Sequence, residues 1–197
     1  LLMTKFPVES LADLDGRKIA APGPAINWLS GTGAVGVSGN LTTYYNELKT
    51  GVYDGVIVFA SAALPGKLYE VAPYVTQAGL GAQYAGALCA NADWYEGLAP
   101  EAQAALHAGA DDAREWYLSA LEGAGATSLK VMGENGATIT AASDDMRAAW
   151  AAGMDNAAKQ WAESLDAKGI PGSEVLALYM NSMRAAGATP LRDWDSE

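Results

Sequence analysis

Hydrophobic and polar positions follow two different periods along the chain. In the first part, short and mostly apolar runs bounded by Gly, Pro and Asp predict strands at 18–21, 56–59 and 85–90, and 75–78 is a further strand candidate. Runs without alternating polar positions are typical of parallel sheets that are covered on both faces. Between these runs we expect helices at 25–29, at 59–68 and from Asn40 or Thr42 to Thr50. This alternation predicts an α/β fold with a sheet rich in parallel strands.

After Pro100 the apolar positions recur at three- and four-residue steps, which is the period of an amphipathic helix. Glycines at 123–125, Gly169 and Pro171 mark expected helix ends, and Ser143 is an expected N-cap. We therefore expect a helix that stops at 123–125, strands at 129–132 and 138–140, a helix from Ser143 to Leu165, a last helix at 173–186 and a fraying polar tail at 191–197.

The stretch 46–59 is the most informative part of the sequence. It predicts a helix end at Gly51, where a positive φ disfavours other residues, then an Asp54-Gly55 turn and a buried strand. Ligands of open α/β sheets bind at the carboxyl ends of such strands. The stretch therefore points to a binding cleft, with Phe59 near its mouth.

Composition and charge exclude several classes of protein. The 197 residues are 50% hydrophobic and 18% charged, as in a globular protein, and suffice for one core or two small ones. The net charge of −11 argues against binding to nucleic acid or to anionic membrane surfaces. No segment reaches the roughly 18 apolar residues of a membrane span.

Enzymatic motifs are weak. Cys89 lies in an apolar run and is typical of a small buried hydrophobe, in a cytosolic protein or in a periplasmic one without disulfides. His107 is the only histidine, and we interpret it as a surface residue. The Gly-rich stretch 31–39 follows a helix instead of a strand, so it fails as a dinucleotide motif. We expect no catalytic residue, no cofactor and no metal.

Several segments resemble one known family. Residues 8–22 read Val-Glu-Ser-Leu-Ala-Asp-Leu-Asp-Gly-Arg-Lys-Ile-Ala-Ala-Pro, residues 45–55 read Tyr-Asn-Glu-Leu-Lys-Thr-Gly-Val-Tyr-Asp-Gly, and residues 67–74 read Lys-Leu-Tyr-Glu-Val-Ala-Pro-Tyr. Asn-Ala-Asp-Trp at 91–94 and Leu-Ala-Pro-Glu-Ala-Gln at 98–103 follow. In this order and spacing they resemble the DctP-like solute-binding proteins of tripartite ATP-independent periplasmic (TRAP) transporters. The similarity runs from about Phe6 through the helix after Pro100, and weakly to the C-terminus.

The resemblance implies a periplasmic-binding-protein-like two-lobed fold. Residues 1–82 would form most of the second lobe, 83–127 would return to the first lobe through a long connecting helix, and 128–197 would pack on the second lobe and the hinge. The family has a signal peptide and a substantial region before the motif at Ser10, and neither is present in this sequence. Leu-Leu-Met-Thr at 1–4 is typical of a domain interior. From the resemblance we therefore expect a C-terminal fragment of a periplasmic protein.

The resemblance also implies a function without catalysis. Such a subunit captures a small organic solute, closes about a hinge and delivers the solute to the membrane subunits of the transporter. Its partners would be the solute and those subunits, not nucleic acid, and exposed apolar surface would favour self-association of a fragment. A ligand-sensing domain or a small α/β enzyme of unknown reaction stays the alternative.

The sequence departs from the family at the expected ligand site. The family holds a ligand carboxylate with an arginine whose place is taken here by Ala20, and a polar position falls on Val58. Arg17 lies three residues from Ala20, so it would face the other side of the strand. The resemblance implies an organic acid, whereas these departures favour a more apolar or aromatic solute. The candidate ligand-binding residues are Ala20, Trp28, Leu41, Tyr45, Val58 and Phe59, with Tyr44 as a further wall and core packing as the alternative for each aromatic residue.

Overall fold

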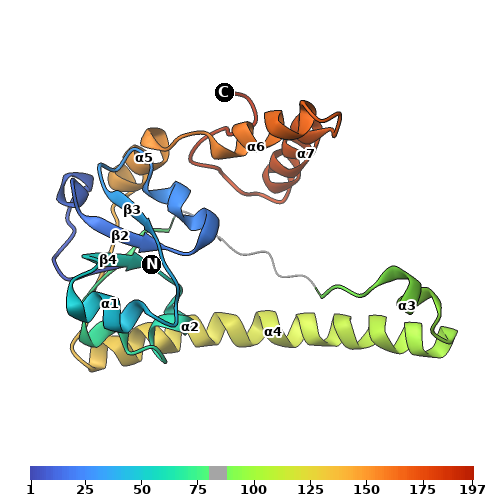
Figure 1. The fold of residues 1–197 in the computed structure, drawn as a ribbon, viewed down its shortest axis with the longest axis horizontal. Coiled ribbons are helices and arrows are strands. Elements are labelled where there is room, and N and C mark those ends of the chain that lie inside the picture. The colour runs from blue at the N-terminus through green and yellow to red at the C-terminus, as the bar shows by residue number, and fades with distance from the viewer. Residues whose placement is uncertain (80–87) are drawn as a thin grey trace.

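A mixed sheet with helices around it lies at the left of Figure 1 in the computed structural model, which describes residues 1–79 and 88–197. Its six strands have the order β3-β2-β4-β1-β5-β6. β2 is parallel to β3 and β4, β1 is antiparallel to β4 and β5, and β5 is parallel to β6. The strands are β1 Leu2–Thr4, β2 Lys18–Ala21, β3 Val35–Ser38, β4 Gly55–Ile57, β5 Tyr74–Gln77 and β6 Thr138–Ala141.

Helices cover both faces of the sheet. The α-helices are α1 Tyr44–Thr50, α2 Ala60–Ala63, α3 Ala92–Glu96, α4 Pro100–Glu134, α5 Asp144–Gly153, α6 Ala157–Asp166 and α7 Gly172–Ala185. The 3-10 helices are η1 Leu11–Leu14, η2 Gly23–Leu29 and η3 Leu68–Glu70. The described part of the chain has no helix that combines the length and apolar character needed to cross a bilayer.

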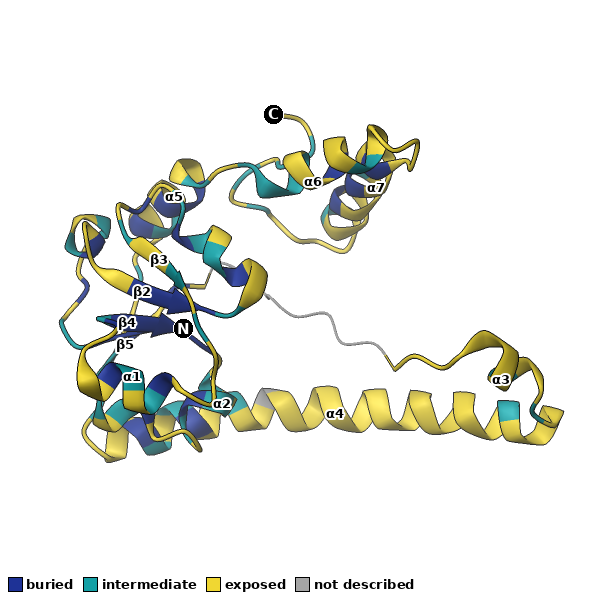
Figure 2. Cartoon of the chain, in the orientation of Figure 1, coloured by how far each residue is buried: buried dark blue, intermediate teal, exposed yellow. Residues whose placement is uncertain are grey.

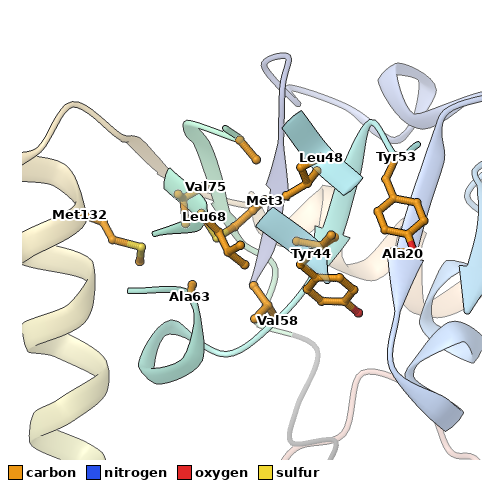
Figure 3. Packing of buried hydrophobic residues seen from close by; sticks show 12 residues of the cluster. Met3, Ala20, Tyr44, Leu48, Tyr53, Val58, Ala63, Leu68, Val75 and Met132 are labelled. Carbon is orange, nitrogen blue, oxygen red and sulfur yellow. The ribbon is translucent and has the colours of Figure 1, made fainter. Parts of the chain in front are cut away.

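Each face of the sheet has its own core. Met3 and Val56 pack with Tyr44 and with Met132 of α4 on one face (Figure 3). Leu2 and Ile57, the neighbours of Met3 and Val56 in their strands, pack with Trp150 of α5 on the other. Successive strand residues point to opposite faces, so strands between two cores carry apolar residues toward both faces. The predicted α/β fold and its covered sheet are confirmed.

Helix α4 packs on the sheet only through its last turns (Figures 1 and 2). Ser128 and Met132 are buried there, whereas most of the helix from Pro100 onward is exposed. The expected helix stop at 123–125 and strand at 129–132 are therefore wrong. A glycine inside a helix costs about 1 kcal/mol, which the packing of Met132 on the first core offsets.

Other boundaries also differ from the expectations. β1 and β3 were not predicted, and β3 lies in the stretch that the glycines at 31–39 made look like a loop. The single helix expected from Ser143 is divided into α5 and α6. The side chain of Asn156 caps the N-terminus of α6 by accepting a hydrogen bond from the Lys159 backbone N–H. Of the expected strand at 85–90, residues 85–87 lie outside the described residues and 88–90 are not a strand.

The C-terminal tail is held in place, contrary to the expectation that it frays. Arg184 of α7 donates to Asp193 and to both carboxylate oxygens of Asp195. Arg192 lies 4.5 Å from the centre of the Trp194 ring, and the Trp194 carbonyl accepts a hydrogen bond from Asn156. These contacts tie the tail to α7 and to the start of α6.

Acid should release this tail. Hydrogen bonds from Arg184 hold the pKa of Asp195 below its ordinary value of about 3.9. A depressed folded-state pKa stabilises the docked tail above pH ~4, and this contribution is lost as the pH falls through the depressed value. We expect the Trp194 indole NMR signal to move toward its unfolded position below pH 4. The Asp195→Asn protein should show the unfolded position of this signal already at pH 7, whereas Asp112→Asn, on exposed α4, should behave as the wild type. If the Trp194 signal changed with pH in the same way in the wild type and both variants, the role of Asp195 would be contradicted.

Candidate functional site

The carboxyl ends of five strands meet at one edge of the sheet. β2, β3 and β4 are parallel, β5 has the same direction because β1 is antiparallel to both β4 and β5, and β6 is parallel to β5. The chain leaves this edge through η2, the segment 39–43, the start of α2 and Gly79. Open α/β sheets bind ligands outside the carboxyl ends of their strands, so this is the candidate ligand edge.

Three of the six sequence-predicted residues lie at the ligand edge. Trp28 is a half-buried residue of η2, which follows β2. Leu41 follows β3 and is 48% exposed, and Phe59 follows β4 as the N-cap residue of α2 and is 40% exposed. Leu41 and Phe59 therefore keep apolar surface in solvent at an edge where ligand contact would cover it.

Ala20 and Val58 do not reach the surface of this edge. Both belong to the buried core on the α1 side of the sheet. Ala20 adjoins Gly39 and Tyr44, because a Cβ placed on Gly39 would lie 2.9 Å from Ala20 Cβ and 2.5 Å from a Tyr44 ring carbon. The Tyr44 ring thus occupies the space into which a longer side chain at position 20 would extend.

The two tyrosines of α1 support the fold. Tyr44 is fully buried and makes an edge-to-face contact with Tyr53, with ring centres 6.2 Å apart. The Tyr45 hydroxyl donates to Glu70 Oε2 at 2.8 Å, and this hydrogen bond raises the pKa of Tyr45. Glu70 belongs to η3, on the same face of the sheet as α1, so the hydrogen bond of Tyr45 anchors α1 to η3.

Trp150 fixes the position of η2 at the ligand edge. Its Nε1 donates to the Trp28 carbonyl oxygen at 2.6 Å, so α5 holds η2 from behind. A small cavity of about 50 Å³ lies between Trp28, Trp150, Leu2 and Ile57. The buried Trp150 thereby places the half-buried Trp28 beside the strand ends.

A larger groove opens next to Trp28. It has a volume of about 570 Å³ and lies between η2, α5, α7 and the C-terminal tail. Arg147 of α5, Tyr179 of α7 and Trp194 of the tail contribute to its walls. Sequence reasoning missed these three residues because they come from distant elements and only Trp28 followed a recognised strand.

No catalytic constellation appears in residues 1–79 and 88–197. His107 Nε2 lies 2.7 Å from the Tyr95 hydroxyl, between α3 and α4 and remote in sequence from the ligand edge. Cys89 is exposed. Within the described residues, no group of His, Cys, Asp and Glu side chains has the arrangement of a metal site.

Comparison with known proteins gives one family. Residues 2–165 match the model of DctP, bacterial extracellular solute-binding protein, family 7. Comparison with curated protein sequences finds no significant match.

Several solved structures are similar to the chain. The periplasmic ectoine-binding protein of the TeaABC TRAP transporter of Halomonas elongata has 25% identity and a TM-score of 0.77, over 93% of this chain and 60% of that one. A TRAP periplasmic solute-binding protein of Chromohalobacter salexigens with bound D-glucuronate has 22% identity and a TM-score of 0.71, over 83% of this chain and 54% of that one. A third, from Pseudomonas putida F1 and also with bound D-glucuronate, has 21% identity and a TM-score of 0.68, over 95% of this chain and 56% of that one.

These relatives are longer than the chain, which spans about half to three fifths of their length. The match to the family model nevertheless covers most of the sequence, from the first strand to the end of α6. The mixed sheet with helices on both faces agrees with the fold of the TRAP solute-binding proteins. The chain therefore belongs to the DctP family of bacterial extracellular solute-binding proteins, family 7.

Proposed function

We propose that this chain is part of the solute-binding subunit of a TRAP transporter, which captures a small organic solute in the periplasm. The ligand edge carries the proposal, because the half-buried Trp28 and the exposed Leu41 and Phe59 meet where open α/β sheets bind ligands. The solutes named for the similar structures, ectoine and D-glucuronate among them, are small organic molecules with a carboxylate. The membrane subunits of the transporter are the proposed recipients.

We propose that the chain divides into lobes as the family resemblance implies. Residues 1–82 would be most of the second lobe, 83–127 would return to the first lobe, and 128–197 would pack on the second lobe and the hinge. The long exposed part of α4 supports this division (Figure 2). Trp116, Tyr117 and Leu118 there are exposed apolar residues, which a first lobe or a second copy of the chain would cover.

Calorimetry on the complete polypeptide encoded by the gene tests this function. Titration with D-glucuronate, beta-D-galacturonate, L-galactonate and ectoine should give saturable binding of at least one solute. The solute should be recovered unchanged, since capture breaks no bond. Absence of binding throughout this panel would contradict the proposed solute class, and chemical conversion would favour the alternative of a small α/β enzyme.

Phe59→Ala should weaken solute binding about tenfold, because the solute would lose an apolar wall whose burial contributes about 1.5 kcal/mol. Phe59 is partly exposed, so the mutant should keep most of its stability. Phe6 is the only other phenylalanine. It follows antiparallel β1 and so lies at the opposite strand ends, with the centre of its ring 4.5 Å from the Arg17 guanidinium carbon, which makes Phe6→Ala the matched control. Affinity and melting temperature should be measured on both. A large loss of stability with unchanged affinity would place Phe59 in the core.

A further inference from the structure

We infer that Arg147 of α5 supplies the positive charge that binds an anionic group of the solute, in the groove between η2, α5, α7 and the tail. The inference rests on the proposed function and adds to it a specificity-determining residue and the chemical class that this residue selects. It places the charge on the α5 side of the sheet, away from Ala20.

Arg147 is positioned at the ligand edge by contact with the end of β5. Its Nη2 donates to the Gly79 carbonyl oxygen at 2.9 Å. The guanidinium lies close against Gly79, because a Cβ at that position would be 3.1 Å from Nε and 3.4 Å from Cζ. Gly79 has a φ of +63°, which a residue with a side chain adopts only with strain. The glycine therefore lets the guanidinium reach the sheet edge.

Much of the hydrogen-bonding capacity of Arg147 is unused. Its Nε is buried, and no acceptor among the described residues lies within hydrogen-bond distance. Among the described residues, its Nη1 has Asp144 as its partner at 3.5 Å, and the Asp144 side chain is 99% exposed, so water screens this pair. A guanidinium has five N–H donors in a planar fork that matches a carboxylate.

The other two arginines of this region, Arg184 and Arg192, already donate to acceptors within the protein. Arg184 bonds Asp193 and Asp195, and Arg192 bonds Glu197 and the carbonyl oxygens of Ala151 and Met154. Among the described residues that line the groove, Arg147 is the only cation and Asp155 the only anion. A single cation with unused donors, in a protein with a net charge of −11, marks where an anionic group would be attracted.

The groove has the size and walls of a small-molecule site. Its volume of about 570 Å³ lies within the range of about 300–1,000 Å³ for ligand pockets. Trp28, Tyr179 and Trp194 provide aromatic surface around the charge. Apolar walls with one charged anchor suit a small carboxylate that has a flat or ring-shaped body.

The core around Ala20 explains why the charge comes from another element. Ala20 is fully buried in the core that contains Tyr44, so a guanidinium at position 20 would enter that core. Ala20 faces the α1 side of the sheet, whereas α5 and Trp150 cover the other side, from which Arg147 reaches the edge.

Calorimetry with a carboxylate and its neutral counterpart tests the inference on the complete polypeptide. The probes are D-glucuronate and D-glucose, together with the other acids of the panel above. Charge-assisted hydrogen bonds contribute enough that Arg147→Gln should lower affinity for the bound acid about tenfold to a hundredfold. Arg147→Lys should restore part of this loss because it keeps the charge without the fork. Arg114→Gln is the matched control, since Arg114 pairs with Asp111 in the same i,i+3 arrangement on exposed α4.

The outcomes separate the inference from the proposed function. Loss of acid binding in Arg147→Gln, unchanged binding in Arg114→Gln, and unchanged melting temperatures would support it. Acid binding that is equal in wild type and Arg147→Gln would overturn the role of Arg147 and leave the proposed function intact. If the wild-type protein bound neither the acids nor D-glucose, both would be overturned.

Discussion

Trp150→Ala should lower the free energy of unfolding by about 3–5 kcal/mol, as large-to-small aromatic substitutions in cores do. Trp150 is 1% exposed and packs in the core on the α5 side of the sheet. The substitution also removes the donor to the Trp28 carbonyl oxygen, which frees η2 from α5. The free energy of unfolding of a native protein is only about 5–15 kcal/mol, so the mutant should lose much of its stability. Urea unfolding followed by circular dichroism measures the change.

Trp116→Ala is the matched control for this substitution. Trp116 is 71% exposed on the projecting part of α4, so its removal should change the free energy of unfolding by at most about 0.5 kcal/mol. Equal losses for the two tryptophans would mean that the packing of α5 on the sheet is not what stabilises the fold.

Ala20→Arg should destabilise the protein by at least about 3 kcal/mol, since it combines overpacking with an unpaired buried charge. Ala20 is fully buried on β2, opposite Val56 in the register and in the same core as Tyr44. The sequence alone allowed the opposite result, a new carboxylate clamp. Expression in the soluble fraction and urea unfolding distinguish the two.

Val35→Arg provides the control for Ala20→Arg. Val35 lies on the exposed edge strand β3, opposite Lys18 of β2. An arginine at position 35 reaches solvent, so it should change the free energy of unfolding little. A stable Ala20→Arg protein with increased affinity for D-glucuronate would show that position 20 faces the ligand.

The sequence predicted those elements whose pattern reflects packing on both faces. β2 and β4 appear as apolar runs because each lies between two cores. β3 is an exposed edge strand with a glycine at its second position, so neither hydrophobicity nor propensity marked it. The end of α4 was taken for a strand because its glycines outweighed the helical spacing of Leu129 and Met132, which only the tertiary packing makes decisive.

The candidate site was predictable only where it follows a strand. Trp28 and Phe59 could be placed at the edge because they follow the predicted strands β2 and β4, whereas Leu41 follows β3, which the sequence did not predict. Ala20 and Val58 were placed by resemblance, and the structure buries both in the core on the α1 side of the sheet. Arg147 reaches the groove through a contact with Gly79, 68 residues earlier in the chain, and no local pattern carries that information.

The indole N–H signals of the six tryptophans provide the most direct test of solute capture at the ligand edge. Trp28 and Trp194 line the groove, Trp150 supports it, and Trp94 and Trp116 lie on the distant α3 and α4. Two-dimensional NMR of the complete polypeptide during titration with D-glucuronate or ectoine should shift the Trp28 and Trp194 signals in a saturable way and leave Trp116 unchanged. Saturable shifts confined to Trp94 and Trp116, with Trp28 unmoved, would contradict the account.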